Sequence, residues 1–112
     1  KFNDIVHHNK YANNYNYQRS IHLTNLKHFY DNGAILMVES DKLVSPISVL
    51  FYERYTDQED LKSKIALHSE KLQCVLSAKG WFPGSIDFGK AQTPELEDYA
   101  DNVDTMKFLA AL

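Results

Sequence analysis

The chain has one cysteine, no excess of basic residues and no long apolar run. The single thiol of Cys74 excludes an internal disulfide and indicates a reducing, cytoplasmic setting. A formal net charge of -3 provides no positive field for a phosphate backbone, which argues against nucleic acid as a partner. Apolar runs such as residues 34–38 fall far short of the roughly 20 residues that cross a bilayer, so we expect no membrane span.

Motifs for cofactor phosphates and metal ions are also missing. The glycines at positions 80, 84 and 89 have neither the spacing of a dinucleotide loop nor that of a P-loop. The five histidines form no recognised metal set, and the acids of residues 95–104 lack the spacing of an EF-hand. We therefore interpret the glycines as turn residues and the histidines as surface or capping residues.

What is present is an ordinary globular composition, 44% hydrophobic and 24% charged in 112 residues. This length fits one domain, residues 1–112, and is too short for a cofactor domain plus a catalytic domain. Apolar spacing predicts a helix over residues 9–28 and strands at 34–38 and 47–52. Because the first of these strands shows little alternation, we expect it to be buried on both faces.

The second half of the chain continues this pattern. Thr56-Asp57-Gln58-Glu59 matches a capping box, which predicts a helix from there to about residue 71. The apolar run at 72–76 then predicts a third buried strand. Thr93-Pro94 indicates the start of a short helix over residues 95–100. Asp104 indicates the start of another through residue 112, although Met106, Phe108 and Leu109 would also suit an end strand. The fold class is accordingly α/β, a small three-stranded sheet flanked by helices.

Cys74 is the one candidate nucleophile. A catalytic thiol needs exposure and a positive neighbourhood, whereas Cys74 falls in a strand that we expect to be buried. We interpret it as a small apolar filler of the core. The alternative is a thiol enzyme that uses Cys74, which requires a reagent-accessible thiol; a pair with His68 requires the strand to fold back on the end of the helix.

Several short blocks, in this order, resemble the C-terminal part of a bacterial acyl-CoA reductase of the luminescence-type fatty acyl reductase family. These blocks are Asn14-Tyr15, Asp31-Asn32-Gly33, Ser45-Pro46-Ile47, Leu72-Gln73-Cys74, Phe88-Gly89 and residues 98–109. Jointly they cover nearly the whole chain. The resemblance implies membership of the aldehyde dehydrogenase superfamily and a fragment of its catalytic lobe.

In that family a cysteine takes the acyl group from a thioester, and NADPH or NADH delivers the hydride that releases an aldehyde. The resemblance places the nucleophilic cysteine upstream of Lys1, so no catalytic residue is expected here, and Cys74 does not match it. It also implies that NADP or NAD binds the full-length enzyme and not this segment. A first residue other than methionine fits an expectation that the chain begins inside a longer polypeptide.

The resemblance carries over to three site residues. Phe88 and Gly89 match a segment beside the substrate pocket, so both are expected to line an acyl channel. Pro46 matches a segment that contacts the nicotinamide ribose, although Lys42 stands where that segment has a glutamate. The expected partners are an acyl-CoA or acyl thioester substrate, the missing N-terminal part of the same enzyme and an acyl-activating protein. The alternative is a non-enzymatic α/β interaction module whose Tyr/Asn-rich first helix docks a partner.

Overall fold

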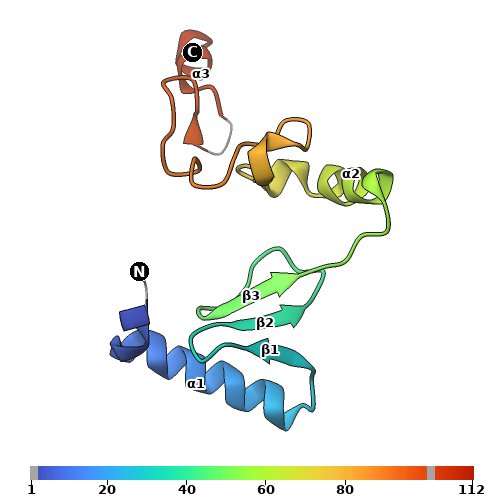
Figure 1. The fold of residues 1–112 in the computed structure, drawn as a ribbon. Helices are drawn as coiled ribbons and strands as arrows, with labels where there is room; N and C mark the ends of the chain where they lie inside the picture. Colours follow the sequence, from blue (N-terminus) through green and yellow to red (C-terminus); the bar gives the residue numbers. More distant parts are fainter. Residues whose placement is uncertain (1–2, 101–102) are drawn as a thin grey trace. The chain divides into compact units, whose positions relative to one another are not determined.

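The computed structural model describes residues 3–100 and 103–112, which form a small α/β protein (Figure 1). The chain divides into two compact units, Lys1–Thr56 and Asp57–Leu112. The first unit holds a three-stranded mixed sheet, and each unit is described below by itself. The elements, in chain order, are η1 (Asn3–His7), α1 (Asn9–Thr24), β1 (Phe29–Asp31), β2 (Leu36–Glu39), β3 (Val49–Tyr52), α2 (Gln58–Leu67), η2 (Ser69–Lys71), η3 (Ala78–Gly80) and α3 (Thr105–Ala110).

The sheet of the first unit has the order β1-β2-β3, with β1 antiparallel to β2 and β2 parallel to β3. The residue types of Asp31-Asn32-Gly33 predict either a helix stop or a tight turn, and in the structure they form the tight turn that joins β1 to β2. The Asn32 side-chain oxygen accepts from the N–H groups of Ala34 at 3.0 Å and Ile35 at 2.9 Å, and Gly33 has a φ of 87° that favours glycine. Residues 40–48 connect the parallel strands without a helix.

The core of the first unit lies between α1 and one face of the sheet. Leu36, Val38 and Val49 are buried there, and partly buried side chains that include Tyr15 of α1 pack against them. Residues of β2 alternate between buried and exposed, and Met37 is 37% exposed. The prediction that this strand is buried on both faces is therefore wrong, because α1 covers one face only within this unit.

The first helix is shorter than residues 9–28. It ends at Thr24, where the Asn25 N–H donates to the Ile21 carbonyl at 3.0 Å and the Leu26 N–H donates to the Leu23 carbonyl at 3.1 Å. Leu26 then has a φ of 51°, which an α-helix does not allow. Residues 25–28 instead connect α1 to β1, and Phe29–Asp31 is the third strand of the sheet.

In the second unit, helix α2 begins one residue later than the capping box predicts. Asp57 is the N-cap, and its carboxylate accepts from the Asp60 N–H at 2.8 Å. The carboxylate of Glu59 pairs with Lys62 at 2.8 Å. The helix ends at Leu67, and the 3₁₀ turn of η2 follows.

The predicted third strand at residues 72–76 does not form. Leu76 alone makes a bridge, to Ile86, and this bridge lies outside the named strands. The helix expected at residues 95–100 is wrong as well, because the Asp98 carboxylate accepts from the Glu95 N–H in a turn. The last cap is confirmed, since Asp104 begins α3 and accepts from the Lys107 N–H at 2.9 Å. Residues 101 and 102 of the matched C-terminal block lie outside the described residues.

Candidate functional site

Phe88 and Gly89 lie in a tight turn of the second unit. The Asp87 carboxylate holds this turn by accepting from the N–H groups of Lys79 and Phe88, both at 2.8 Å. Gly89 has a φ of 81°, and a Cβ added there would meet nothing within 4 Å. A glycine at position 89 therefore allows the left-handed backbone conformation. In the same turn, Phe88 is exposed over 64% of its surface.

Two serines that precede Phe88 in the sequence, Ser77 and Ser85, support this turn. The Ser77 hydroxyl accepts from the Phe82 N–H at 3.1 Å and lies 2.5 Å from the Ser85 hydroxyl oxygen, which itself donates to the Phe82 carbonyl at 2.6 Å. Phe82 is buried beside them. The loop is therefore closed by side-chain hydrogen bonds around one aromatic ring, and this closure fixes the chain that leads into Phe88.

A pocket of about 450 Å³ lies beside the turn, within the second unit. Phe88 and Gly89 do not line it, but their neighbours do: its lining is Gln73, Cys74, Gly84, Ile86, Lys90, Ala91, Pro94, Asp98, Tyr99 and Ala100. The lining mixes apolar and polar side chains, and Lys90 and Asp98 bring one charge of each sign. The pocket could hold part of an apolar ligand with a polar end.

Cys74 contradicts its predicted burial, because it is exposed and lines this pocket. The prediction failed because the strand that would have buried the thiol does not form. Exposure removes one objection to a reactive thiol. The lining residues nevertheless include no histidine, and the charge of Lys90 is opposed by that of Asp98, so the described pocket offers the thiol no evident general base.

Pro46 belongs to the first unit, whereas Phe88 and Gly89 belong to the second. It is exposed in the connection between β2 and β3, where its carbonyl oxygen accepts from the Val49 N–H at 3.1 Å. Ser48 follows with a φ of 67° and is buried. Pro46 thus lies in the sharp turn that leads into β3. This backbone position accounts for the proline without a contact to the nicotinamide ribose.

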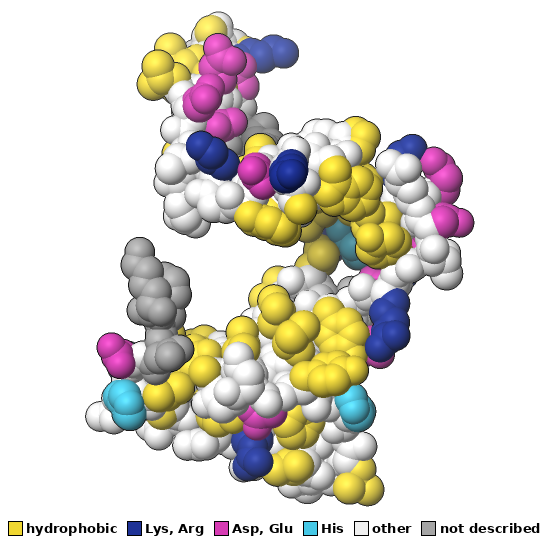
Figure 2. All heavy atoms as spheres, in the orientation of Figure 1, with side chains coloured by type: hydrophobic (Ala, Val, Ile, Leu, Met, Phe, Trp, Pro, Cys, Tyr) yellow, Lys and Arg dark blue, Asp and Glu magenta, His cyan; other side chains and the backbone are white. Residues whose placement is uncertain are grey.

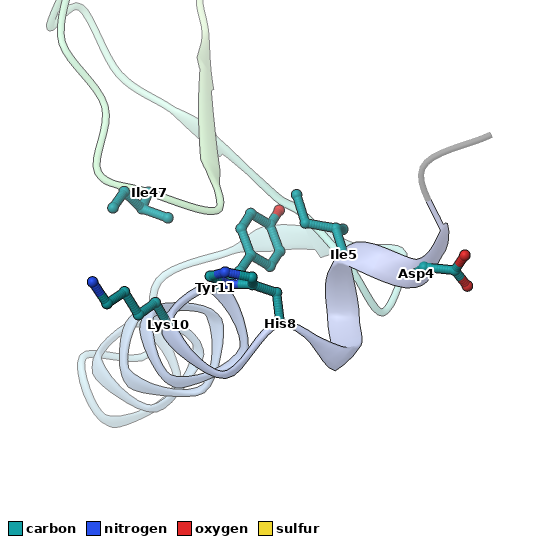
Figure 3. Close-up of a pocket in the computed structure, with 6 residues that line it drawn as sticks. All are labelled: Asp4, Ile5, His8, Lys10, Tyr11 and Ile47. Carbon is teal, nitrogen blue, oxygen red and sulfur yellow. The ribbon is translucent and has the colours of Figure 1, made fainter.

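The first unit has a pocket that the sequence did not indicate (Figure 3). It measures about 550 Å³ and is lined by Asp4, Ile5, His8, Lys10, Tyr11 and Ile47. The Tyr11 hydroxyl donates to the Ala34 carbonyl at 2.6 Å, which fixes the ring as an apolar wall. Sequence reasoning missed this pocket because Ile47 is remote in sequence from Ile5 and Tyr11, and no motif links them.

A polar cluster ties α1 to the end of β1. The Asp31 carboxylate accepts from the Tyr15 hydroxyl at 2.5 Å, the Gly33 N–H at 2.8 Å and the Arg19 Nε–H at 2.9 Å. Burial alone would raise the pKa of Asp31, but these hydrogen bonds hold it below its ordinary value. Burial and the neighbouring carboxylate raise the pKa of Tyr15. Because Asp31 accepts from two residues of α1 and from the turn after β1, these hydrogen bonds hold α1 to the end of β1. We call this cluster the clamp.

His22 is the one buried histidine among the described residues. Its ring packs against that of Phe29 in a tilted arrangement with centroids 5.8 Å apart, and its buried Nδ1 has no hydrogen-bond partner within the described residues. Burial, with a smaller effect of Lys27, lowers the pKa of His22. In residues 3–100 and 103–112, no group of three His, Cys, Asp or Glu side chains is placed to hold a metal ion, and no helix is long and apolar enough to cross a membrane.

Comparison with known proteins returned no match to a family model, a curated protein or a solved structure.

Proposed function

We propose that this chain is the C-terminal part of an NAD(P)H-dependent acyl-CoA reductase. It supplies scaffold and one wall of the acyl pocket, and the reacting cysteine and the nicotinamide site lie on other polypeptide of the same enzyme. In this role the segment alone is inactive. The blocks that resemble the family, such as Ser45-Pro46-Ile47 and Phe88-Gly89, support the family and the reaction.

The small buried core is the observation that carries the supporting role. Among the described residues, the buried apolar side chains are Leu36, Val38 and Val49 in the first unit and Phe82 in the second. Units of this size bury a small share of their surface and are only marginally stable by themselves. The exposed surface of each unit therefore keeps most of its large apolar side chains, which favours a chain that further polypeptide covers.

The composition of this surface supports the same reading (Figure 2). Few large apolar residues are buried, whereas side chains that are more than about three quarters exposed include Leu26, Val44, Leu67, Leu96 and Leu112. Contiguous exposed apolar surface usually marks an interaction site. A partner that covers it would stabilise both units by burying this area.

The test compares the segment with the product of the complete gene. We expect acyl-CoA-dependent oxidation of NADPH or NADH by the complete enzyme and none by the segment. Phe88→Ala in the complete enzyme should raise KM for the acyl thioester about tenfold with a small change in kcat, because it removes binding and no reacting group. Phe108→Ala is the matched control, since Phe108 is 60% exposed against 64% for Phe88. Turnover by the segment alone contradicts the proposal, as does an equal effect of the two substitutions.

A non-enzymatic interaction module is the second candidate, and the outer face of the sheet favours it. Tyr30, Met37 and Leu50 are in register across the three strands, and all are at least one third exposed. Parallel strand pairs are usually covered on both faces, so this face suits a docked helix. A complete gene without a nucleophilic cysteine or a cofactor domain, and no turnover by its product, would decide for this candidate.

A further inference from the structure

The pocket of the first unit has apolar walls supplied by three parts of the chain. Ile5 comes from η1, Tyr11 from the first turns of α1, and Ile47 from the connection before β3 (Figure 3). The hydroxyl of Tyr11 is already bonded to Ala34, so its ring cannot turn away without losing that bond. A volume of about 550 Å³ falls within the usual range of small-molecule sites.

The charge around this pocket is uneven. The Lys10 side chain lies on the side of the pocket near Ile47, and it makes no ion pair within the described part of the chain (Figure 3). The carboxylate of Asp4 points away from the other lining side chains (Figure 3). The first turn of α1 contains no acidic residue, and the His8 side chain does not cap it. The pocket thus combines a mainly apolar lining with one cation, Lys10, which pairs with no carboxylate in the described part of the chain.

We propose that this pocket binds a small aliphatic carboxylate, with the alkyl chain between Ile5, Tyr11 and Ile47 and the carboxylate at the Lys10 ammonium. Two properties select this ligand class. The lining is mainly apolar, which favours an alkyl chain over a sugar or nucleotide. The unpaired cation favours an anionic end over a neutral or cationic one. This site lies in the first unit and does not depend on the proposed function.

The experiment is an amide NMR titration of the full chain with octanoate. We expect saturable shifts centred on residues 5–11 and 47. Acetate has the charge without the alkyl chain, and octylamine has the chain with the opposite charge, so both should bind at least about tenfold more weakly. Shifts without saturation, shifts centred on the second unit, or equal binding of octylamine would each overturn the proposal.

Two substitutions test the assigned contacts. Lys10→Gln should weaken octanoate binding about tenfold, because a charge-assisted contact is lost. Lys27→Gln removes the same charge beyond the far end of α1 and should change the affinity less than about twofold. Ile47→Asp should abolish saturable octanoate binding, while the amide signals of β2 should remain those of the folded chain. Equal effects of Lys10→Gln and Lys27→Gln would show that octanoate senses only net charge, and the site assignment would then be wrong.

Discussion

The clamp at Asp31 gives the most direct test of how the first unit is held together. Asp31→Ala removes an acceptor that three donors share: the Tyr15 hydroxyl, the Gly33 N–H and the Arg19 guanidinium. Each hydrogen bond contributes about 0.5–1.5 kcal/mol. The ion pair adds little, about 0–1 kcal/mol, because the Arg19 side chain is 49% exposed. We therefore expect a loss of about 2–3 kcal/mol in the free energy of unfolding of this unit.

Amide hydrogen exchange at Leu36 measures this loss. The Leu36 N–H donates to the Ser48 carbonyl at 2.9 Å, inside the sheet that the clamp joins to α1. A loss of about 2–3 kcal/mol corresponds to exchange that is roughly 30 to 150 times faster. Asp31→Asn keeps an oxygen for Tyr15 and Gly33 and should cost about half as much. Exchange at Leu36 that accelerates less than about threefold in Asp31→Ala would refute this account of the clamp.

Three further predictions concern local chemistry. Asp57→Ala should lower the free energy of unfolding of the second unit by about 1 kcal/mol, because α2 loses its N-cap, and Asp57→Asn should restore most of it; urea titration followed by Trp81 fluorescence checks both, and equal losses would contradict the cap. The pKa of His22 is lowered in the folded state, so stability should decline as the pH falls below about 6.5 toward that lowered value; His22→Leu should remove this part of the pH dependence, measured by urea unfolding between about pH 7.5 and 5.5. Cys74 should react with iodoacetamide in the native chain nearly as fast as in urea, because it is exposed; strong native protection would contradict the open pocket.

Pairing within the sheet shows where sequence reasoning reached its limit. The runs at 34–38 and 47–52 were predicted as strands; the first overlaps β2, which extends to Glu39, and the second contains β3. The third strand was placed at 72–76, whereas the structure uses Phe29–Asp31. An apolar run alone does not say which segment it will pair with. The short β1 has no such run, and it joins the sheet because the turn at Asn32 and Gly33 brings it alongside β2.

The candidate site divides in the same way. Gly89 was predicted to be a turn residue, and the Asp87 carboxylate holds the turn that contains Phe88 and Gly89. Their role beside an acyl chain stays a prediction. The predicted burial of Cys74 was wrong, because it depended on a strand at residues 72–76. That strand would form only if a distant segment of the chain paired with it. The pocket at Lys10 was not predicted, because its walls come from separate segments.

The sequence alone determined the features that neighbouring residues settle among themselves: the turn at Asn32 and Gly33, the cap at Asp104 and the strand character of two apolar runs. Their energies arise from contacts within a few residues, so local chemistry suffices. Tertiary structure decided the strand order, the single covered face of the sheet and the clamp at Asp31. Those outcomes depend on which distant side chains share a surface, and that is fixed only when the chain packs.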